Sequence, residues 1–334
     1  MRAFAMMLDD RGYTMNRRTF AELDLLKDFY DSTGDHLDLI ESKDLDHAFE
    51  DDSYNALIVT TSGFTPSNAY ETSPTIAKMK KFDGEIIVFY DDQILTGKIS
   101  KMMSCLGRKA WLLAPNGYDD EIFRRAPDLK DRFYGTLSVT PIFAVGRRMK
   151  NEFARNPKTF DSQTHDLDFF YGGSIRPGFA PRFREVFSTT TQDKVGSYGA
   201  FGRAFGLEDV RGRHSKTLSK EDLCRQTSRA RFSFLPADTG KNYLTSKAFE
   251  NGFSESLCVL EDVPGDQGRY NDSVIGHPFY TSKYDADSIK KLLSMDEEER
   301  KDRVRQQRLR LLDVDYDGLI MGDQLEMKRR MGMD

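Results

Sequence analysis

Short, continuously apolar runs alternate along this chain with segments of helical periodicity. The apolar runs cover 3–8, 56–61, 85–90, 110–114 and 138–145 in the first half, and 166–171, 193–198, 232–236 and 257–261 in the second. Helical patterns cover 16–32, 73–81, 220–230, 245–254 and 285–293, with Ser73 as the expected N-cap and Pro74 at the first helical position. Runs that are apolar on both faces suit parallel strands covered by helices on both sides. The alternation therefore predicts an α/β fold.

A chain of 334 residues is long enough for two domains of ordinary size. The polar stretch 150–165 contains Pro, Asn and Ser and little apolar content, so we interpret it as a linker. We expect a Rossmann-like domain over 1–150, a linker over 151–165, a second Rossmann-like domain over 166–308, and a helical tail over 309–334 that packs back on the first domain. Because parallel sheets bind ligands at the carboxyl ends of their strands, the two domains are expected to face a central cleft.

The composition excludes several broad classes of protein. Disorder is excluded as the dominant state, because 24 Phe and 14 Tyr supply ample apolar bulk. A net charge of −5 excludes an all-over basic coat but leaves room for a local basic groove. The three cysteines lie far apart without paired spacing, which predicts reduced thiols. Neither a signal peptide nor an apolar run of about 18 residues is evident, so we expect a cytoplasmic protein without membrane spans.

A glycine turn follows the first strand of the second half. Residues 166–178 read as a strand that ends in Gly172 and Gly173, followed by Ser174 and Arg176. Glycines let backbone N–H groups approach a phosphate closely, and an arginine supplies a planar bidentate partner. Such turns are also common as purely structural connections, so the spacing alone leaves both interpretations open. The chain has no GxGxxG after its first strand and no GxxxxGK[ST], which disfavours nicotinamide or flavin Rossmann enzymes and P-loop nucleotidases.

Two further segments place polar side chains after apolar strands. Lys247 and Glu250 are three residues apart at the start of an expected helix, where a cation could meet a phosphate and a carboxylate could hold a ribose diol. An ordinary surface ion pair is the alternative. Asp91 and Asp92 end the strand 85–90, and one of them could be a general base towards an alcohol or could cap the next helix.

The glycine turn, Tyr171–Gly178 (YGGSIRPG), closely resembles the donor-site turn of the T-even bacteriophage DNA β-glucosyltransferase family. Residues 54–62, 89–91 and 242–250 resemble other segments of that family in the same order and at similar spacing. The resemblance spans most of the chain, although only the turn is near-identical. It implies a GT-B fold, with two Rossmann-like domains facing a cleft, and a glycosyltransferase that uses a UDP-sugar donor.

The resemblance also implies roles for individual residues. Asp91 matches the catalytic base, and Glu22 matches a carboxylate on the sugar side. The implied donor-binding residues are Gly172, Gly173, Ser174, Arg176, Lys216, Asp238, Lys247 and Glu250, of which Glu250 matches the ribose contact; Asp92, Arg182 and Tyr243 are further candidates. The family has an arginine where this chain has Lys247, which keeps the charge but loses the bidentate fork. Arg182 lies two positions later than the second arginine of the family.

The implied reaction moves a sugar, glucose being favoured, from UDP-glucose to the hydroxymethyl group of 5-hydroxymethylcytosine in double-stranded DNA. It would be an inverting single displacement on a base flipped out of the duplex. The sugar-contacting loops do not match well, so transfer of another sugar, such as arabinose from UDP-arabinose, is the first alternative. A second alternative is a nucleic-acid-binding module on a decayed GT-B body, against which the joint presence of Asp91, Arg176 and Glu250 argues.

Cofactors and partners follow from the same resemblance. Mg²⁺ or Mn²⁺ could assist the leaving diphosphate, but no metal-ligand spacing is present, and an EF-hand-like segment at 313–318 lacks the final glutamate. We expect a monomer in the cytoplasm of an infected host cell, where DNA modification would evade restriction. The candidate DNA-contacting positions are Arg17, Arg18, Arg108, Lys109, Arg124, Arg125, Arg147, Arg148, Lys150, Arg203, Arg211, Arg213 and Lys216. With a net charge of −5, these residues are expected to gather around one cleft.

Overall fold

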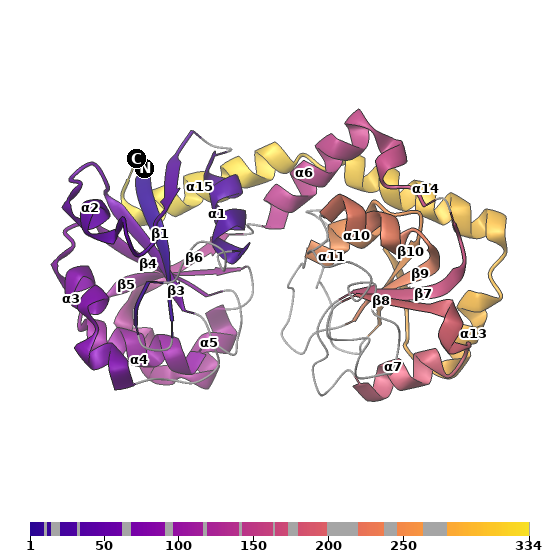
Figure 1. The fold of residues 1–334 in the computed structure, drawn as a ribbon, viewed down its shortest axis with the longest axis horizontal. Helices are drawn as coiled ribbons and strands as arrows, with labels where there is room; N and C mark the ends of the chain where they lie inside the picture. Colours follow the sequence, from indigo (N-terminus) through magenta and orange to yellow (C-terminus); the bar gives the residue numbers. More distant parts are fainter. Residues whose placement is uncertain are drawn as a thin grey trace. The chain divides into compact units, whose positions relative to one another are not determined.

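The computed structural model describes residues 1–9, 12–14, 21–31, 34–61, 68–90, 96–115, 119–139, 142–162, 164–172, 180–198, 220–236, 246–262 and 279–333. The chain forms two compact units, Met1–Ala144 with Asp315–Asp334, and Val145–Val314. Each unit has a parallel sheet flanked by helices (Figure 1), so the predicted α/β class is confirmed.

The first unit is built on a six-stranded sheet in the order β2-β1-β3-β4-β5-β6, with every pair parallel. Its elements are β1 (Arg2–Leu8), α1 (Ala21–Asp31), β2 (His36–Leu39), α2 (Leu45–Glu50), β3 (Ala56–Thr61), the 3₁₀ helix η2 (Asn68–Thr72), α3 (Pro74–Lys81), β4 (Glu85–Phe89), α4 (Thr96–Leu106), β5 (Ala110–Pro115), α5 (Asp119–Arg125), η4 (Pro127–Arg132), β6 (Phe133–Val139) and α15 (Tyr316–Met331). β1 and β3 pair from Ala3↔Ala56 to Leu8↔Thr61. Both strands are buried along almost their whole length, as their continuous apolar sequences predict.

The second unit repeats this topology with five parallel strands in the order β11-β10-β9-β7-β8. Its elements are η5 (Pro157–Thr159), β7 (Leu167–Gly172), α7 (Ala180–Phe187), η6 (Gln192–Lys194), β8 (Val195–Tyr198), α10 (Lys220–Thr227), β9 (Ala230–Leu235), α11 (Ser246–Gly252), β10 (Leu257–Glu261), β11 (Tyr280–Ser282), α13 (Ala286–Leu293) and α14 (Glu297–Asp313). In both units the first strand lies between the second and the third. This arrangement creates a topological switch point at β1 and at β7.

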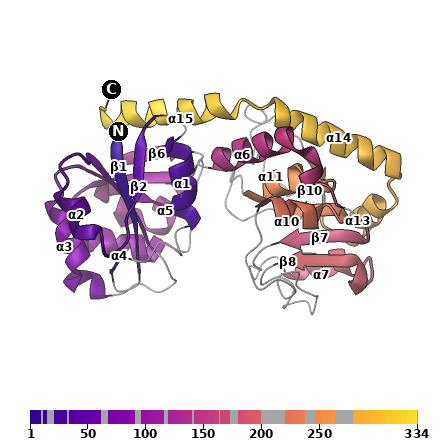
Figure 2. The same cartoon turned by 45° about the horizontal axis from the view of Figure 1, so that its top comes forward.

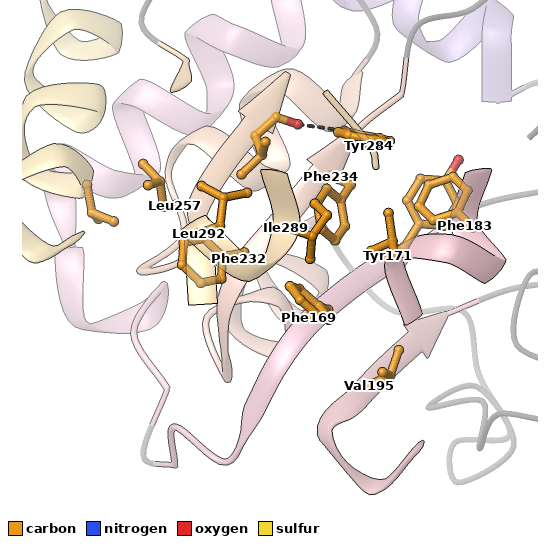
Figure 3. Packing of buried hydrophobic residues seen from close by; sticks show 13 residues of the cluster. Phe169, Tyr171, Phe183, Val195, Phe232, Phe234, Leu257, Tyr284, Ile289 and Leu292 are labelled. Atoms are coloured by element: carbon orange, nitrogen blue, oxygen red, sulfur yellow. Dashed lines mark hydrogen bonds between the residues drawn. The ribbon is translucent and has the colours of Figure 1, made fainter. Parts of the chain in front are cut away.

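An aromatic core covers one face of the second sheet. Phe169, Phe232 and Phe234 from the strands pack with Ile289 and other residues of α7 and α13 (Figure 3). The Tyr284 hydroxyl, just before α13, donates a 2.7 Å hydrogen bond to the Val259 carbonyl of β10. On the other face, Leu223 of α10 packs against Phe170 and Ala230. The carboxyl ends of the central strands are thus held between two layers of helices.

The predicted strand over 138–145 is wrong. β6 ends at Val139, and Ile142 begins α6 (Ile142–Arg155). The apolar run Ile142–Ala144 is the buried first turn of an amphipathic helix, in which Met149 and Phe153 are buried at helical spacing. β6 itself carries Gly, Thr and Ser and exposes Tyr134, so it lacks the continuous apolar pattern of a strand covered on both faces.

α6 also passes through the region where the sequence suggested a linker. The expected boundary at residue 150 lies inside this helix, and the division between the compact units falls at 144/145. At the carboxyl end, α14 belongs to the second unit, and the segment grouped with the first unit starts at Asp315 rather than at 309. Figure 2 shows α15 beside β6. Within the described part of the chain, no helix is both long and apolar enough to cross a membrane.

Candidate functional site

The switch point of the second sheet brings together the two segments singled out in its sequence. β7 ends at Gly172, where the glycine turn begins, and the neighbouring strand β9 ends at Leu235. The chain after β9 re-enters the described residues as α11, which carries Lys247 and Glu250. Adjacent parallel strands on either side of a switch point release their chains at the same edge, which is where doubly wound sheets bind ligands.

Lys247 places its ammonium at this edge. Its Nζ lies 5.2 Å from the centroid of the Tyr171 ring, a cation–π contact. Tyr171 is only 2% exposed and packs on Phe183 of α7, with ring centroids 4.7 Å apart. Because Tyr171 directly precedes Gly172, the positive charge lies beside the start of the glycine turn.

Glu250 lies one turn further along α11, and it is buried, with 2% of the residue exposed. Its negative charge acts on the thiol of Cys224 in α10. Burial raises the pKa of this thiol well above its usual value, the charge of Arg308 lowers the pKa, and the charge of Glu250 raises it further. A carboxylate in this setting is not half of an exposed surface ion pair, which was the alternative left open by the sequence. Lys247 and Glu250 therefore present a cation at the edge of the sheet and a buried carboxylate behind it.

Arg182 reaches the same edge from α7. Its guanidinium forms an ion pair with the carboxylate of Glu261, the last residue of β10. The Glu261 side chain is 4% exposed, whereas that of Arg182 is 30% exposed. Glu261 was missed by the sequence reasoning. The signal for it was present, since Glu261 is an acidic residue at the end of an apolar strand, the same pattern that pointed to Asp91 and Asp92.

The remaining sequence candidates are not described by the structure. Asp91, Asp92, Gly173, Ser174, Arg176, Lys216, Asp238 and Tyr243 lie outside the described residues, as does the side chain of Glu22. Tyr90, directly before Asp91, is fully buried, and its N–H donates a 2.8 Å hydrogen bond to the Leu113 carbonyl at the carboxyl end of the first sheet. The structure thus places Gly172, Arg182, Lys247 and Glu250 at one edge of the second sheet, and the roles of these four residues, like those of the other candidates, remain predictions.

Several basic candidates for DNA contact have structural partners. Arg108 donates to the carbonyls of Phe82 and Gly84, and Lys150 donates to the Val314 carbonyl. Arg148 pairs with Glu221 at 3.1 Å. Arg124 and Arg125 are exposed in the last turn of α5. The candidates at 17, 18, 203, 211, 213 and 216 lie outside the described residues.

The acidic segment at 313–318 has a structural explanation. The Asp315 carboxylate accepts a 3.0 Å hydrogen bond from the Gly318 N–H and caps α15. No group of three or more His, Cys, Asp or Glu side chains suited to a metal ion occurs among the residues whose placement is described.

Solved structures share this fold over nearly the full chain. The DNA-modifying enzyme β-glucosyltransferase, solved with and without uridine diphosphoglucose, superposes with a TM-score of 0.65 at 17% identity, covering 99% of this chain and 100% of that one. The chain shares the two-domain GT-B fold with this enzyme. An α-glucosyltransferase in complex with UDP-glucose and DNA containing an abasic site gives a TM-score of 0.59 at 12% identity, covering 97% and 98%. A complex of α-glucosyltransferase with UDP and DNA containing an HMU base also gives 0.59, at 11% identity, covering 97% and 98%.

The resemblance to known proteins is detected by comparison of structures and not by comparison of sequences. No protein-family profile matches the chain, and no curated protein sequence matches it. The resemblance stated from the sequence is therefore confirmed at the level of the fold.

Proposed function

We propose that this protein is a glycosyltransferase that moves a sugar, with glucose favoured, from a UDP-sugar to the hydroxymethyl group of 5-hydroxymethylcytosine in duplex DNA. The observation that carries the proposal is the Lys247 ammonium 5.2 Å from the Tyr171 ring, directly before Gly172 at the switch point of the second sheet. A cation at this position suits a diphosphate bound against the glycine turn. The β-glucosyltransferase that shares the fold was solved with UDP-glucose, and the α-glucosyltransferase with UDP or UDP-glucose and DNA, which supports this donor and acceptor class.

The donor would be held by its diphosphate and its ribose. Lys247, Arg176 and the amides and hydroxyl of Gly172–Ser174 would contact the diphosphate, where negative charge accumulates as the bond to the sugar breaks. Glu250, buried one turn along α11, would accept hydrogen bonds from the ribose diol. Asp238, Lys216 and Tyr243 are the further donor-side candidates.

The acceptor alcohol is too weakly acidic to attack at neutral pH without a base. Asp91 would remove its proton as the oxygen attacks the anomeric carbon, and the bond from that carbon to the diphosphate would break in the same step, with inversion. Glu22 would lie on the sugar side, and Asp92 is the neighbouring candidate. The target base would be flipped out of the duplex, since its hydroxymethyl group is otherwise enclosed by the stack.

The decisive experiment incubates the protein with hydroxymethylcytosine DNA and a panel of UDP-sugars, and measures the mass of the DNA. A hexose or pentose mass shift supports the proposal and identifies the sugar. Asp91→Ala should abolish the shift while UDP still binds. Each donor is tested in the presence of Mg²⁺, of Mn²⁺ and of EDTA. If no donor produces a mass shift under any of these conditions, the proposal is overturned in favour of a DNA-binding module.

A further inference from the structure

Glu261 is a buried carboxylate that the proposed mechanism does not use. It ends β10, where Leu260 is in register with Leu235, so it lies level with the carboxyl end of β9. It is 6% exposed. A buried carboxylate is costly unless an opposite charge and hydrogen bonds compensate it, and Arg182 supplies that charge.

The partner of Glu261 comes from the helix that follows the glycine turn. Phe183, next to Arg182 in α7, packs on Tyr171 of β7 and on Phe234 of β9 (Figure 3), so this part of α7 lies over the two switch-point strands. Arg182 then meets Glu261 at the end of β10, the strand beyond β9. Its guanidinium therefore lies at the carboxyl ends of β9 and β10.

Two cations thus approach the same edge from opposite layers. Lys247 comes from α11, whose contacts with α10 place it on the face opposite α7 and α13. Arg182 comes from α7. The Glu261 side chain is almost fully buried while that of Arg182 is 30% exposed, so the positive member of the pair is the more exposed one.

We propose that Glu261 is a positioning residue that fixes the Arg182 guanidinium at the carboxyl edge of the second sheet, where it binds the diphosphate of the nucleotide sugar. The inference rests on the proposed function and deepens its donor site. In the sequence, Arg182 lies two positions later than the second arginine of the resembling family. The ion pair with Glu261 is an independent reason to place its guanidinium at this edge.

The test compares binding of UDP and of uridine to the full-length protein by titration calorimetry. Glu261→Gln keeps the size of the side chain and removes its charge, so Arg182 loses its anchor. We expect UDP to bind about tenfold more weakly, which corresponds to about 1.4 kcal/mol, and uridine to bind as it does to the wild type. Glu185→Gln is the matched control, because it removes one carboxylate from exposed α7 surface near Ala286.

A second variant separates positioning from other effects. Arg182→Gln should also weaken UDP binding about tenfold, and adding Glu261→Gln to it should weaken UDP no further, because the two residues act as one unit. Arg182 is partly exposed, so this variant keeps the test valid if Glu261→Gln does not fold.

Three results would overturn the inference. If Glu261 is only a nearby negative charge, its removal relieves repulsion and UDP binds equally well or more tightly. If it is only structural, UDP and uridine weaken together. If the wild-type protein binds no UDP, the proposed function fails first and this inference fails with it.

Discussion

The lysine beside Tyr171 is a point charge, whereas the resembling family has an arginine fork at this position. Lys247→Met removes a charged hydrogen-bond donor from the diphosphate, and such contacts are worth about 1.5–3 kcal/mol. We expect the KM for the UDP-sugar to rise by about ten- to a hundredfold, and Lys247→Arg to stay close to the wild type. The measurement is steady-state kinetics at saturating DNA. Lys290→Met, on the exposed side of α13, is the control, and an equal effect there would contradict the assignment.

The buried Glu250 carboxylate makes a different prediction, about the ribose. Glu250→Gln replaces a strong acceptor by an amide, so hydrogen bonds from the ribose diol weaken. The wild-type protein should prefer UDP over 2′-deoxy-UDP by about tenfold, and the variant should lose most of that preference. Competition binding with the two nucleotides measures the ratio directly. A variant that binds both nucleotides more weakly but keeps the wild-type ratio would show that Glu250 only supports α11.

Among the elements, those enclosed by helices on both faces were predictable from sequence. The strands at 56–61 and 257–261 have the expected bounds, and Ser73 caps α3 by accepting from the Ile76 N–H, as predicted. Continuous apolar sequence is decisive where a strand is buried on both sides. It gives no signal for the short edge strands β2 and β11, or for β6, which is partly open to solvent.

The candidate site follows the same division between local and distant information. Lys247 and Glu250 could be found because both lie in one short segment with a helical spacing. The pair of Arg182 and Glu261 could not, because its members are 79 positions apart and meet only when β10 aligns beside β9. Local pattern identifies what a strand end carries, while topology decides which strand ends are neighbours.

The long helix α14 holds the carboxyl end of α11, the helix that carries Lys247 and Glu250. Gln307 is 1% exposed; its amide donates to the Gly252 carbonyl at 2.9 Å and accepts from the Cys258 N–H at 3.0 Å. Gln307→Leu leaves both backbone groups buried and unpaired, at about 1–3 kcal/mol each. We expect a lower denaturant midpoint for the second unit and weaker UDP binding. Gln306→Leu changes the exposed neighbour and should have little effect. Equal midpoints for the two variants would contradict a stabilising role for the hydrogen bonds of Gln307.

At the scale of the whole molecule, a net charge of −5 must be reconciled with binding to a polyanion. Arg124 and Arg125 are an exposed candidate pair for phosphate contact, adjacent to each other in the last turn of α5. Replacing both with Gln should reduce the slope of log affinity against log salt by about 0.9 for each DNA phosphate that these arginines neutralise. Filter binding across a salt series measures this slope. The control replaces Lys301 and Arg305 of α14 with Gln. This changes the net charge by the same amount as the Arg124 and Arg125 replacements and should leave the slope unchanged.

The last helix ties the end of the chain to the beginning of the first unit. Tyr30 contacts the Met327 sulfur at 3.4 Å, Lys328 pairs with Asp35 at 2.7 Å, and Asp35 also binds the N-terminal amine. Ile320 is fully buried, whereas its neighbour Met321 is 55% exposed.

These adjacent residues test whether α15 is part of the first fold. Ile320→Lys places a charge in the core and loses about 1.5–3 kcal/mol of apolar burial in addition to the cost of burying an ammonium. We expect the first unit to unfold at a clearly lower temperature while the second keeps its transition and its affinity for UDP. Met321→Lys should change neither. Scanning calorimetry with and without UDP resolves the two outcomes, since UDP should raise only the transition of the unit that binds it. If Ile320→Lys instead lowered the UDP-sensitive transition, α15 would be stabilising the second unit, and the grouping of Asp315–Asp334 with the first unit would be wrong.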